Sequence, residues 1–73
     1  MATVDEAIES ALLELSQAQV KFPKFNSPHE GYAIMLEEMD ELWQDIKHGD
    51  RINMRTEITQ VAAMALRFMI DLT

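Results

Sequence analysis

The sequence predicts an all-α protein, a single domain spanning residues 1–73 that contains three amphipathic helices. Hydrophobic residues make up 48% of the chain and only two Gly and two Pro are present, a composition typical of an ordered helical protein. Strong helix-start signals divide the chain, and apolar residues recur at helical spacing after each signal. Seventy-three residues are enough for one domain at most.

The first helix is predicted to begin at a capping box and to end before Pro23. Thr3 and Glu6 have the spacing at which a hydroxyl and a carboxylate satisfy the free backbone N–H groups of a helix start. Apolar residues then recur at helical spacing: Val4, Ile8, Ala11, Leu12, Leu15 and Ala18. We expect the helix to end near residues 20–22, because the residue before a proline is pushed out of the α region.

The second helix is predicted to run from Pro28 to about Lys47. Ser27 is in position to cap it, Pro28 occupies the first helical position, and Glu30 completes a second capping box. Gly49 follows the predicted end and supplies a left-handed C-terminal cap.

The third helix is predicted to begin between Asp50 and Asn53 and to continue close to the C-terminus. From Ile58 to Leu72 only four side chains are polar: Thr59, Gln60, Arg67 and Asp71. A helix that is apolar around most of its circumference is buried on more than one side. A three-helix monomer has too few partners to cover it. We therefore expect the protomers to assemble into an oligomeric helical bundle, a homodimer or homotetramer, with the third helix at the subunit interface.

The charge of the chain excludes several classes of partner. A net charge of -7 without a basic block disfavours nonspecific binding to nucleic acid or to an anionic membrane surface. The N-terminus lacks the pattern of a secretion signal, and no apolar run approaches the roughly 20 residues that span a bilayer. We expect a cytoplasmic protein with no nucleic-acid or membrane partner, in which a cation mediates any phosphate binding.

The second helix divides into an apolar arc and an acidic arc at roughly 100° per residue. We interpret the apolar arc as the core face: Tyr32, Met35, Leu36, Met39, Leu42, Trp43 and Ile46. The opposite arc holds Glu30, Ile34, Glu37, Glu38, Glu41 and Asp45. Charged helix faces are usually solvated. Here, however, like charges four residues apart are not relieved by lysines, and Ile34 lies within the arc, which favours a face that meets another part of the protein.

A cation would explain why carboxylates are concentrated on this arc. Carboxylates that converge on a partly enclosed site repel one another unless a cation offsets their charge. Oxygen ligands on rigid helices suit Mg²⁺ or Mn²⁺. Glu57 is the only acidic residue in the first turns of the third helix, so we expect it to supply a further ligand, with Gln60 one turn beyond it.

The acidic pattern resembles that of a known family. EEMDE at residues 37–41, followed after 15 residues by EITQ at residues 57–60, is similar to the EExxE and ExxD signature of the MazG-like all-α nucleoside triphosphate pyrophosphohydrolases. The flanking segments HEGYAIMLEEMDELW and QVAAMALRF extend the resemblance from about Phe22 to Leu72. The resemblance implies a Mg²⁺-dependent enzyme that hydrolyses a nucleoside triphosphate between the α and β phosphates, giving a monophosphate and pyrophosphate.

The resemblance also assigns roles to individual residues. Glu38 and Glu41 match carboxylates that bind the metal, and Glu37 matches one that assists them or orients water, so these three form the expected catalytic set. Glu57 matches the ligand from the following helix. The last acidic position of the family is Gln60 here, and a neutral amide is a poorer metal ligand than a carboxylate.

Basic and aromatic side chains are candidates for substrate contacts, although ordinary surface, helix-end or core roles explain most of them better. The candidates for the phosphates are Lys21, Lys24, Arg51, Arg55 and Arg67, and those for the base are Phe22, Phe25, Asn26 and Trp43. Two other classes of function stay open at this point. One is a noncatalytic, self-associating helical module that binds metal or nucleotide, and the other is an acidic protein-binding module that needs no metal.

Overall fold

The computed structural model describes all residues, 1–73, and contains three helices and no strands. The helices are α1 (Val4–Lys21), α2 (Pro28–His48) and α3 (Arg51–Leu72). The all-α prediction is therefore confirmed, and the predicted helix boundaries agree with the observed ones to within about one residue. None of the three helices combines the length and the apolar composition needed to cross a membrane.

Local capping interactions explain where the helices begin and end. At α1 the capping box is complete, since Glu6 N–H donates to Thr3 Oγ1 at 3.2 Å and Thr3 N–H donates to the Glu6 carboxylate at 3.0 Å. Ser27 Oγ accepts from Glu30 N–H at 3.1 Å at the start of α2. Gly49 ends α2 with φ 68°, a left-handed conformation that glycine adopts without steric cost.

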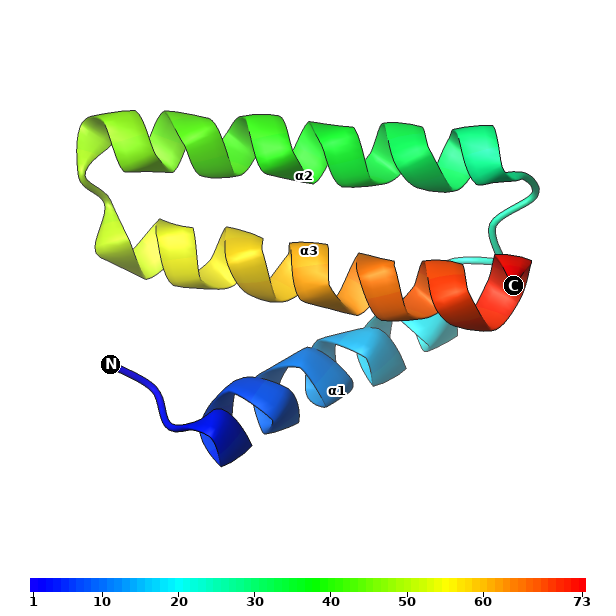
Figure 1. Cartoon of the computed structure of the whole chain (residues 1–73), viewed down its shortest axis with the longest axis horizontal. Helices are drawn as coiled ribbons and strands as arrows, with labels where there is room; N and C mark the ends of the chain where they lie inside the picture. The colour runs from blue at the N-terminus through cyan, green and yellow to red at the C-terminus, as the bar shows by residue number, and fades with distance from the viewer.

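The three helices form an antiparallel hairpin with one helix laid against it (Figure 1). The short link at Gly49 and Asp50 turns the chain back so that α3 runs antiparallel to α2. Helix α1 crosses α3 at an angle and makes no contact with α2. Helix α3 is therefore covered on two sides by its own chain, and a groove opens between α1 and α2.

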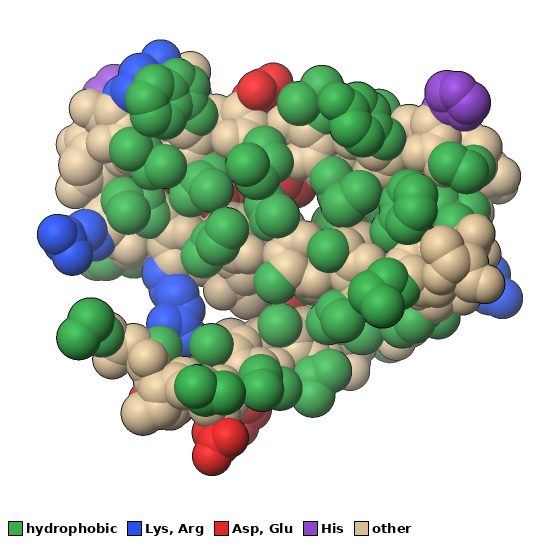
Figure 2. All heavy atoms as spheres, in the orientation of Figure 1, with side chains coloured by type: hydrophobic (Ala, Val, Ile, Leu, Met, Phe, Trp, Pro, Cys, Tyr) green, Lys and Arg blue, Asp and Glu red, His purple; other side chains and the backbone are tan.

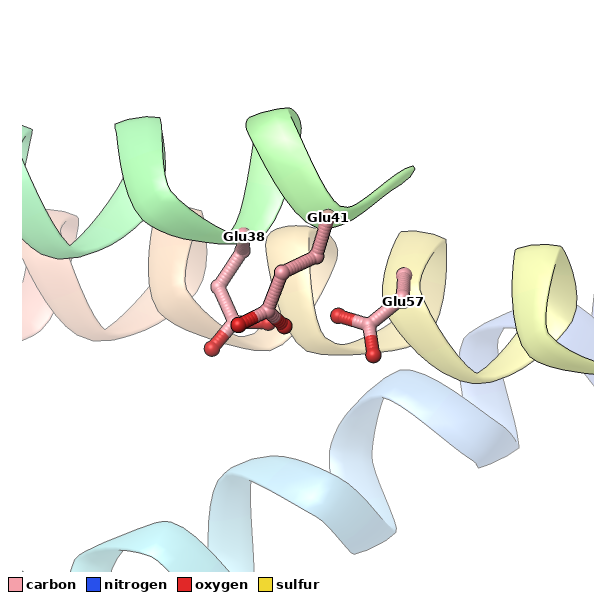
Figure 3. Close-up of side chains that lie close together, drawn as sticks. All are labelled: Glu38, Glu41 and Glu57. Atoms are coloured by element: carbon pink, nitrogen blue, oxygen red, sulfur yellow. The ribbon is translucent and has the colours of Figure 1, made fainter. Parts of the chain in front are cut away.

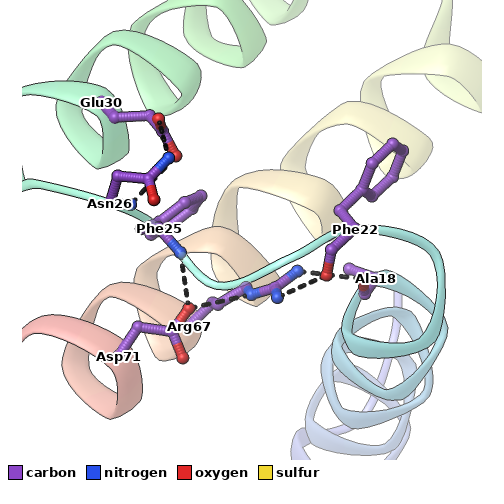
Figure 4. Close-up of polar contacts among 7 residues, drawn as sticks. All are labelled: Ala18, Phe22, Phe25, Asn26, Glu30, Arg67 and Asp71. Carbon is purple, nitrogen blue, oxygen red and sulfur yellow. Dashed lines mark hydrogen bonds and ion pairs between the residues drawn. The ribbon is translucent and has the colours of Figure 1, made fainter.

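A polar clamp fixes the connector between α1 and α2 onto α3. Arg67 is 3% exposed; its guanidinium donates to the carbonyls of Ala18 at 2.9 Å and Phe22 at 2.7 Å and pairs with Asp71 at 3.1 Å (Figure 4). Asp71 Oδ2 also accepts from the N–H of Phe25, whose buried ring lies beneath the guanidinium. Although burial acts to raise the pKa of Asp71, the hydrogen bond from Phe25 and the contacts with Arg67 hold it below its ordinary value.

The prediction that the apolar arc of α2 is a core face is wrong for most of the arc. Five of its seven residues are exposed in the chain: Tyr32, Leu36, Met39, Trp43 and Ile46. Helix α2 instead approaches α3 through the residues that directly precede those five in the sequence. These are Gly31, Met35, Glu38, Leu42 and Asp45. Gly31 permits this approach, because a Cβ atom there would lie 2.7 Å from Phe68 Cδ2. The apolar stripe is thereby turned outward, and the carboxylates of α2 are turned toward the groove.

Candidate functional site

Three carboxylates from two helices converge on the groove between α1 and α2. Glu38 and Glu41 lie one turn apart on α2, and Glu57 faces them from α3. Each offers a carboxylate oxygen such that the three oxygens lie within 4.8 Å of one another. Figure 3 shows the side chains extending toward one another, with α1 running beyond them. We call these three residues the acidic cluster.

Mutual repulsion changes the proton affinity of the acidic cluster. A hydrogen bond with Glu57 and the negative charge of that residue raise the pKa of Glu41 above its ordinary value of 4.5. Burial and a hydrogen bond with Glu38 raise the pKa of Glu57, whereas its hydrogen bond with Glu41 acts in the opposite direction. No Lys or Arg side chain forms an ion pair with the acidic cluster, since the one salt bridge in the chain joins Arg67 and Asp71.

Gln60 completes the acidic cluster as a hydrogen-bond donor. With its amide NH₂ turned toward the carboxylates, Gln60 Nε2 lies 2.6 Å from Glu38 Oε2 and 3.2 Å from Glu57 Oε2. One amide thus bridges two of the three carboxylates and offsets part of their unmet hydrogen-bonding capacity. The predicted role of Gln60 as a metal ligand would require the opposite orientation, with the oxygen facing the ion.

A pocket of about 520 Å³ adjoins the acidic cluster between α1, the connector, α2 and α3. Glu38 and Gln60 belong to its wall, so the pocket and the acidic cluster form one continuous site. The remaining lining residues are Glu14, Gln17, Ala18, Lys21, Phe22, Pro23, Phe25, Glu30, Ile34, Met64 and Arg67. Lys21 offers the ammonium group in this wall, and Phe22 offers exposed apolar ring surface, whereas the Phe25 ring is buried beneath Arg67.

The structure separates the other predicted site residues into those at the pocket and those away from it. Glu37 is exposed on α2 outside the acidic cluster. Lys24 is exposed and does not line the pocket. Asn26 donates its side-chain N–H to Glu30 at 3.0 Å, which explains it as part of the start of α2 (Figure 4). Trp43 is 55% exposed on the outward stripe, with Lys47 above its ring.

Arg67 lines the pocket, but its guanidinium is already engaged in the clamp of Figure 4. Three of its nitrogens donate to Asp71, Ala18 and Phe22. The structure thus gives Arg67 a role in fixing the connector, and its predicted contact with substrate stays a prediction. Of the other two arginines considered, Arg55 donates to Ser10 Oγ at 3.0 Å and so joins α3 to α1.

Two polar residues of the pocket, Glu14 and Gln17, were not predicted from the sequence. They lie on α1 three residues apart and share a face with Ala18 and Lys21. The sequence signal for them was weak, because polar residues beside the core face of an amphipathic helix are common. Only the position of α1 across the groove brings them to the site.

Comparison of the chain with models of protein families, with curated protein sequences and with solved structures gave no match. The function of the chain is therefore inferred from the geometry and chemistry of the site.

Proposed function

We propose that the chain is a Mg²⁺-dependent nucleoside triphosphate pyrophosphohydrolase, which hydrolyses a ribo- or deoxyribonucleoside triphosphate to a monophosphate and pyrophosphate. The observation that carries the proposal is the convergence of Glu38, Glu41 and Glu57 from two helices, with carboxylate oxygens within 4.8 Å, beside a pocket of about 520 Å³. The resemblance of residues 37–41 and 57–60 to the MazG-like signature supports the same reading.

The donor set of the acidic cluster fits a hard divalent cation. Carboxylate oxygens are the ligands that Mg²⁺ and Mn²⁺ prefer, and helices hold them rigidly. The chain supplies no ion pair to the acidic cluster, so its negative charge is uncompensated by protein groups. Glu38, Glu41 and Glu57 would hold the ion, which would neutralise phosphate oxygens when bound.

The neighbouring residues suit the other requirements of the reaction. Lys21 lies in the pocket wall and offers an ammonium group for a phosphate, and the exposed ring of Phe22 offers a surface for a base. Glu37 projects from the same helix as Glu38 and is exposed, so its carboxylate is available to orient the attacking water. Hydrolysis between the α and β phosphates then needs no covalent nucleophile from the protein.

One observation favours a second candidate function, a noncatalytic module that binds metal or nucleotide. Gln60 stands where the MazG-like signature has an acidic residue, and its amide is placed to donate to Glu38 and Glu57. A neutral amide in place of that acidic residue leaves one negative charge fewer beside the acidic cluster, and its hydrogen bonds engage two carboxylates that the reaction needs. Such a module would bind a nucleotide in the pocket without hydrolysing it.

Turnover of a nucleotide panel separates the two candidates. The purified protein is incubated with ribo- and deoxyribonucleoside triphosphates and Mg²⁺, Mn²⁺ or EDTA, and the products are resolved by anion-exchange chromatography. We expect monophosphate and pyrophosphate, no turnover with EDTA, and a loss of at least about a hundredfold in the Glu38→Gln variant. Asp40→Asn is the matched control, because Asp40 is an exposed carboxylate of α2 outside the acidic cluster.

The outcomes are distinct. Nucleotide binding that depends on metal, without turnover of any triphosphate, would establish the noncatalytic module. Neither binding nor a thermal response to Mg²⁺ would leave the acidic protein-binding module as the remaining class and refute the proposal.

A further inference from the structure

Glu14 is a carboxylate of the pocket to which the proposed function gives no role. It lies on α1, is half-buried, and lines the pocket together with Glu38 from α2 and Gln60 from α3. A second, smaller pocket of about 280 Å³ is lined by Glu14 and by Thr59 of α3. Because Thr59 and Gln60 follow Glu57 by less than one turn of α3, these neighbours place Glu14 at the level of the acidic cluster.

Two hydrogen bonds hold this part of α1 on α3. One turn before Glu14, Ser10 Oγ accepts from Arg55 at 3.0 Å. One turn after Glu14, the carbonyl of Ala18 accepts from Arg67 at 2.9 Å. Glu14 therefore lies between two points at which an arginine of α3 binds α1, so its position across from the acidic cluster is set by the fold.

The acidic cluster is reached from the side on which α1 lies. Figure 3 shows its three carboxylates extending toward the α1 ribbon. On the face seen in Figure 2, hydrophobic side chains cover much of α2 and α3, and acidic side chains between these helices are seen only in gaps. A substrate that enters the pocket thus lies between the acidic cluster and α1.

The attacking water of the proposed hydrolysis needs a group that takes up its proton. Such a base must lie within reach of the water and have a lone pair available. Carboxylates that hold a cation have their lone pairs engaged, so the three members of the acidic cluster are poor bases. Histidine is the side chain most often used, but neither His29 nor His48 lines the pocket.

Glu14 is the carboxylate of the pocket that is available for this role. Besides Glu38, two carboxylates line the pocket, Glu14 and Glu30. Both oxygens of Glu30 accept hydrogen bonds from Asn26, at 3.2 and 3.0 Å. No hydrogen bond or ion pair within the chain engages the carboxylate of Glu14. Glu37, which the resemblance associates with the water, is exposed on α2 and does not line the pocket.

We propose that Glu14 is the general base of the hydrolysis, so that α1 contributes a catalytic residue to the site. The inference rests on the proposed function. Glu14 accepts a proton from the attacking water, whose oxygen forms a bond to the α-phosphorus. The bond from that phosphorus to the oxygen that bridges the α and β phosphates breaks, and its electron pair leaves with pyrophosphate. The proton on Glu14 then passes to solvent through the groove.

Steady-state kinetics of the full chain with a triphosphate and Mg²⁺ test this role. We expect Glu14→Gln to lower kcat by at least about a hundredfold and to leave KM within about threefold of the wild-type value. The amide has nearly the same volume as the carboxylate, and no hydrogen bond within the chain is lost. Glu9→Gln is the matched control, since Glu9 is an exposed carboxylate of α1 that does not line the pocket, and it should turn over as the wild type does.

Mg²⁺ binding in the absence of nucleotide gives a readout that does not depend on turnover. Isothermal titration calorimetry should give Glu14→Gln the Mg²⁺ affinity of the wild type, because a base that acts on water is not a ligand of the ion. The affinity of Glu57→Gln should be lower. An Mg²⁺ affinity that falls equally in both variants would assign Glu14 to the ion and overturn its role as the base.

Glu37→Gln decides between the two carboxylates that can act on the water. We expect its kcat to exceed that of Glu14→Gln at least about tenfold, because a residue outside the pocket can only assist the water from a distance. A loss in Glu37→Gln that equals or exceeds the loss in Glu14→Gln would overturn the inference and leave the proposed function standing. A wild type that hydrolyses no triphosphate would refute both.

Discussion

Crowding of like charges is the dominant feature of the site at the level of single residues. Glu41 and Glu57 both have raised pKa values because neighbouring carboxylates oppose their ionisation, with burial contributing most at Glu57. The native fold therefore holds the carboxylates together against repulsion. Functional sites commonly carry such a cost, because the geometry that binds a cation is unfavourable without one.

Removing one charge is expected to stabilise the metal-free protein and to weaken its response to metal. We predict that Glu57→Gln raises the midpoint of thermal unfolding at pH 7 in EDTA and weakens Mg²⁺ binding by at least about tenfold. Differential scanning calorimetry with and without Mg²⁺ measures both effects. The control Asp40→Asn should leave the Mg²⁺-induced shift unchanged. An equal Mg²⁺-induced shift in wild type and Glu57→Gln would show that the acidic cluster is not where the ion binds.

The raised pKa values predict that the carboxylates of the acidic cluster stabilise the fold more as the pH falls. A salt-bridged carboxylate, whose pKa is lowered, has the opposite effect. A folded-state pKa above the ordinary value of 4.5 means that the folded state binds protons more tightly than the unfolded state. The free energy of unfolding should therefore increase as the pH falls from neutral through the raised pKa values toward about 4.5. Glu6 and Asp71 have lowered pKa values, so their contribution is lost at lower pH, below their ordinary values of 4.5 and 3.8.

Thermal midpoints measured in EDTA between pH 4.5 and pH 8 check this dependence. The wild type should gain stability toward the acidic end, and Glu57→Gln should show a flatter profile over the same range. A wild-type profile that falls with decreasing pH throughout this range would contradict the assignment of raised pKa values to the acidic cluster.

Arg67 acts on the structure through its hydrogen bonds rather than through its charge alone. We predict that Arg67→Met lowers the free energy of unfolding by about 3 kcal/mol, because the buried Asp71 partner and the Phe22 carbonyl lose their donor. Chemical denaturation measures the loss. Arg67→Lys keeps the charge without the guanidinium fork and should recover only part of it. A near-neutral Arg67→Met would show that the clamp does not hold the connector.

At the scale of helices, the sequence predicts ends better than it predicts faces. Thr3, Ser27 and Gly49 determine helix ends through contacts within a few residues, so their effect is readable from the sequence. The rotation of α2 depends on residues of α3, which are distant along the chain. Its apolar arc was expected to face the core, and most of it faces outward because the contact with α3 runs through Gly31, Met35 and Leu42.

The site likewise has features that the sequence predicts and features that only the tertiary structure reveals. Glu57 was expected to join Glu38 and Glu41 because it is the only acidic residue in the first turns of the third helix. The structure brings these three together, whereas their role as metal ligands stays a prediction. Glu14 and Gln17 reach the site only through the crossing of α1 over α3, a tertiary feature for which the sequence gives no local signal.

The close approach of α2 and α3 at Gly31 makes a measurable prediction for the hairpin. Gly31→Ala gains about 1 kcal/mol of helix propensity but places a Cβ atom 2.7 Å from Phe68 Cδ2, an overpacking that costs about 1–3 kcal/mol. We expect a net loss of stability, reversed in part by Phe68→Leu in the same chain. Urea unfolding of the two single variants and the double variant measures this coupling. Independent, additive effects would show that the helices do not meet at this position.

At the scale of the whole molecule, α1 is the least secured element. It contacts α3 alone, and few large side chains of the chain are deeply buried. We therefore predict that the amides of α1 exchange with deuterium faster than those in the middle of α2 and α3. Hydrogen exchange followed by mass spectrometry of peptides measures the difference. Equal protection of all three helices would contradict the picture of a stable hairpin that carries a loosely attached α1.

The loose attachment of α1 also bears on ligand binding, since α1 forms one wall of the groove. Lys21, Glu14 and Gln17 reach the pocket only while α1 stays on α3. If a nucleotide bridges α1 and the acidic cluster, ligand binding should slow exchange in α1 more than in the other helices.

We propose that the acidic cluster supports hydrolysis of a nucleoside triphosphate between the α and β phosphates. The most direct single measurement is a ³¹P NMR time course of a triphosphate with the wild-type protein and Mg²⁺. We expect monophosphate and pyrophosphate to appear together, in equal amounts and without inorganic phosphate. An unchanged triphosphate, or its conversion to diphosphate and inorganic phosphate, would refute the proposed function.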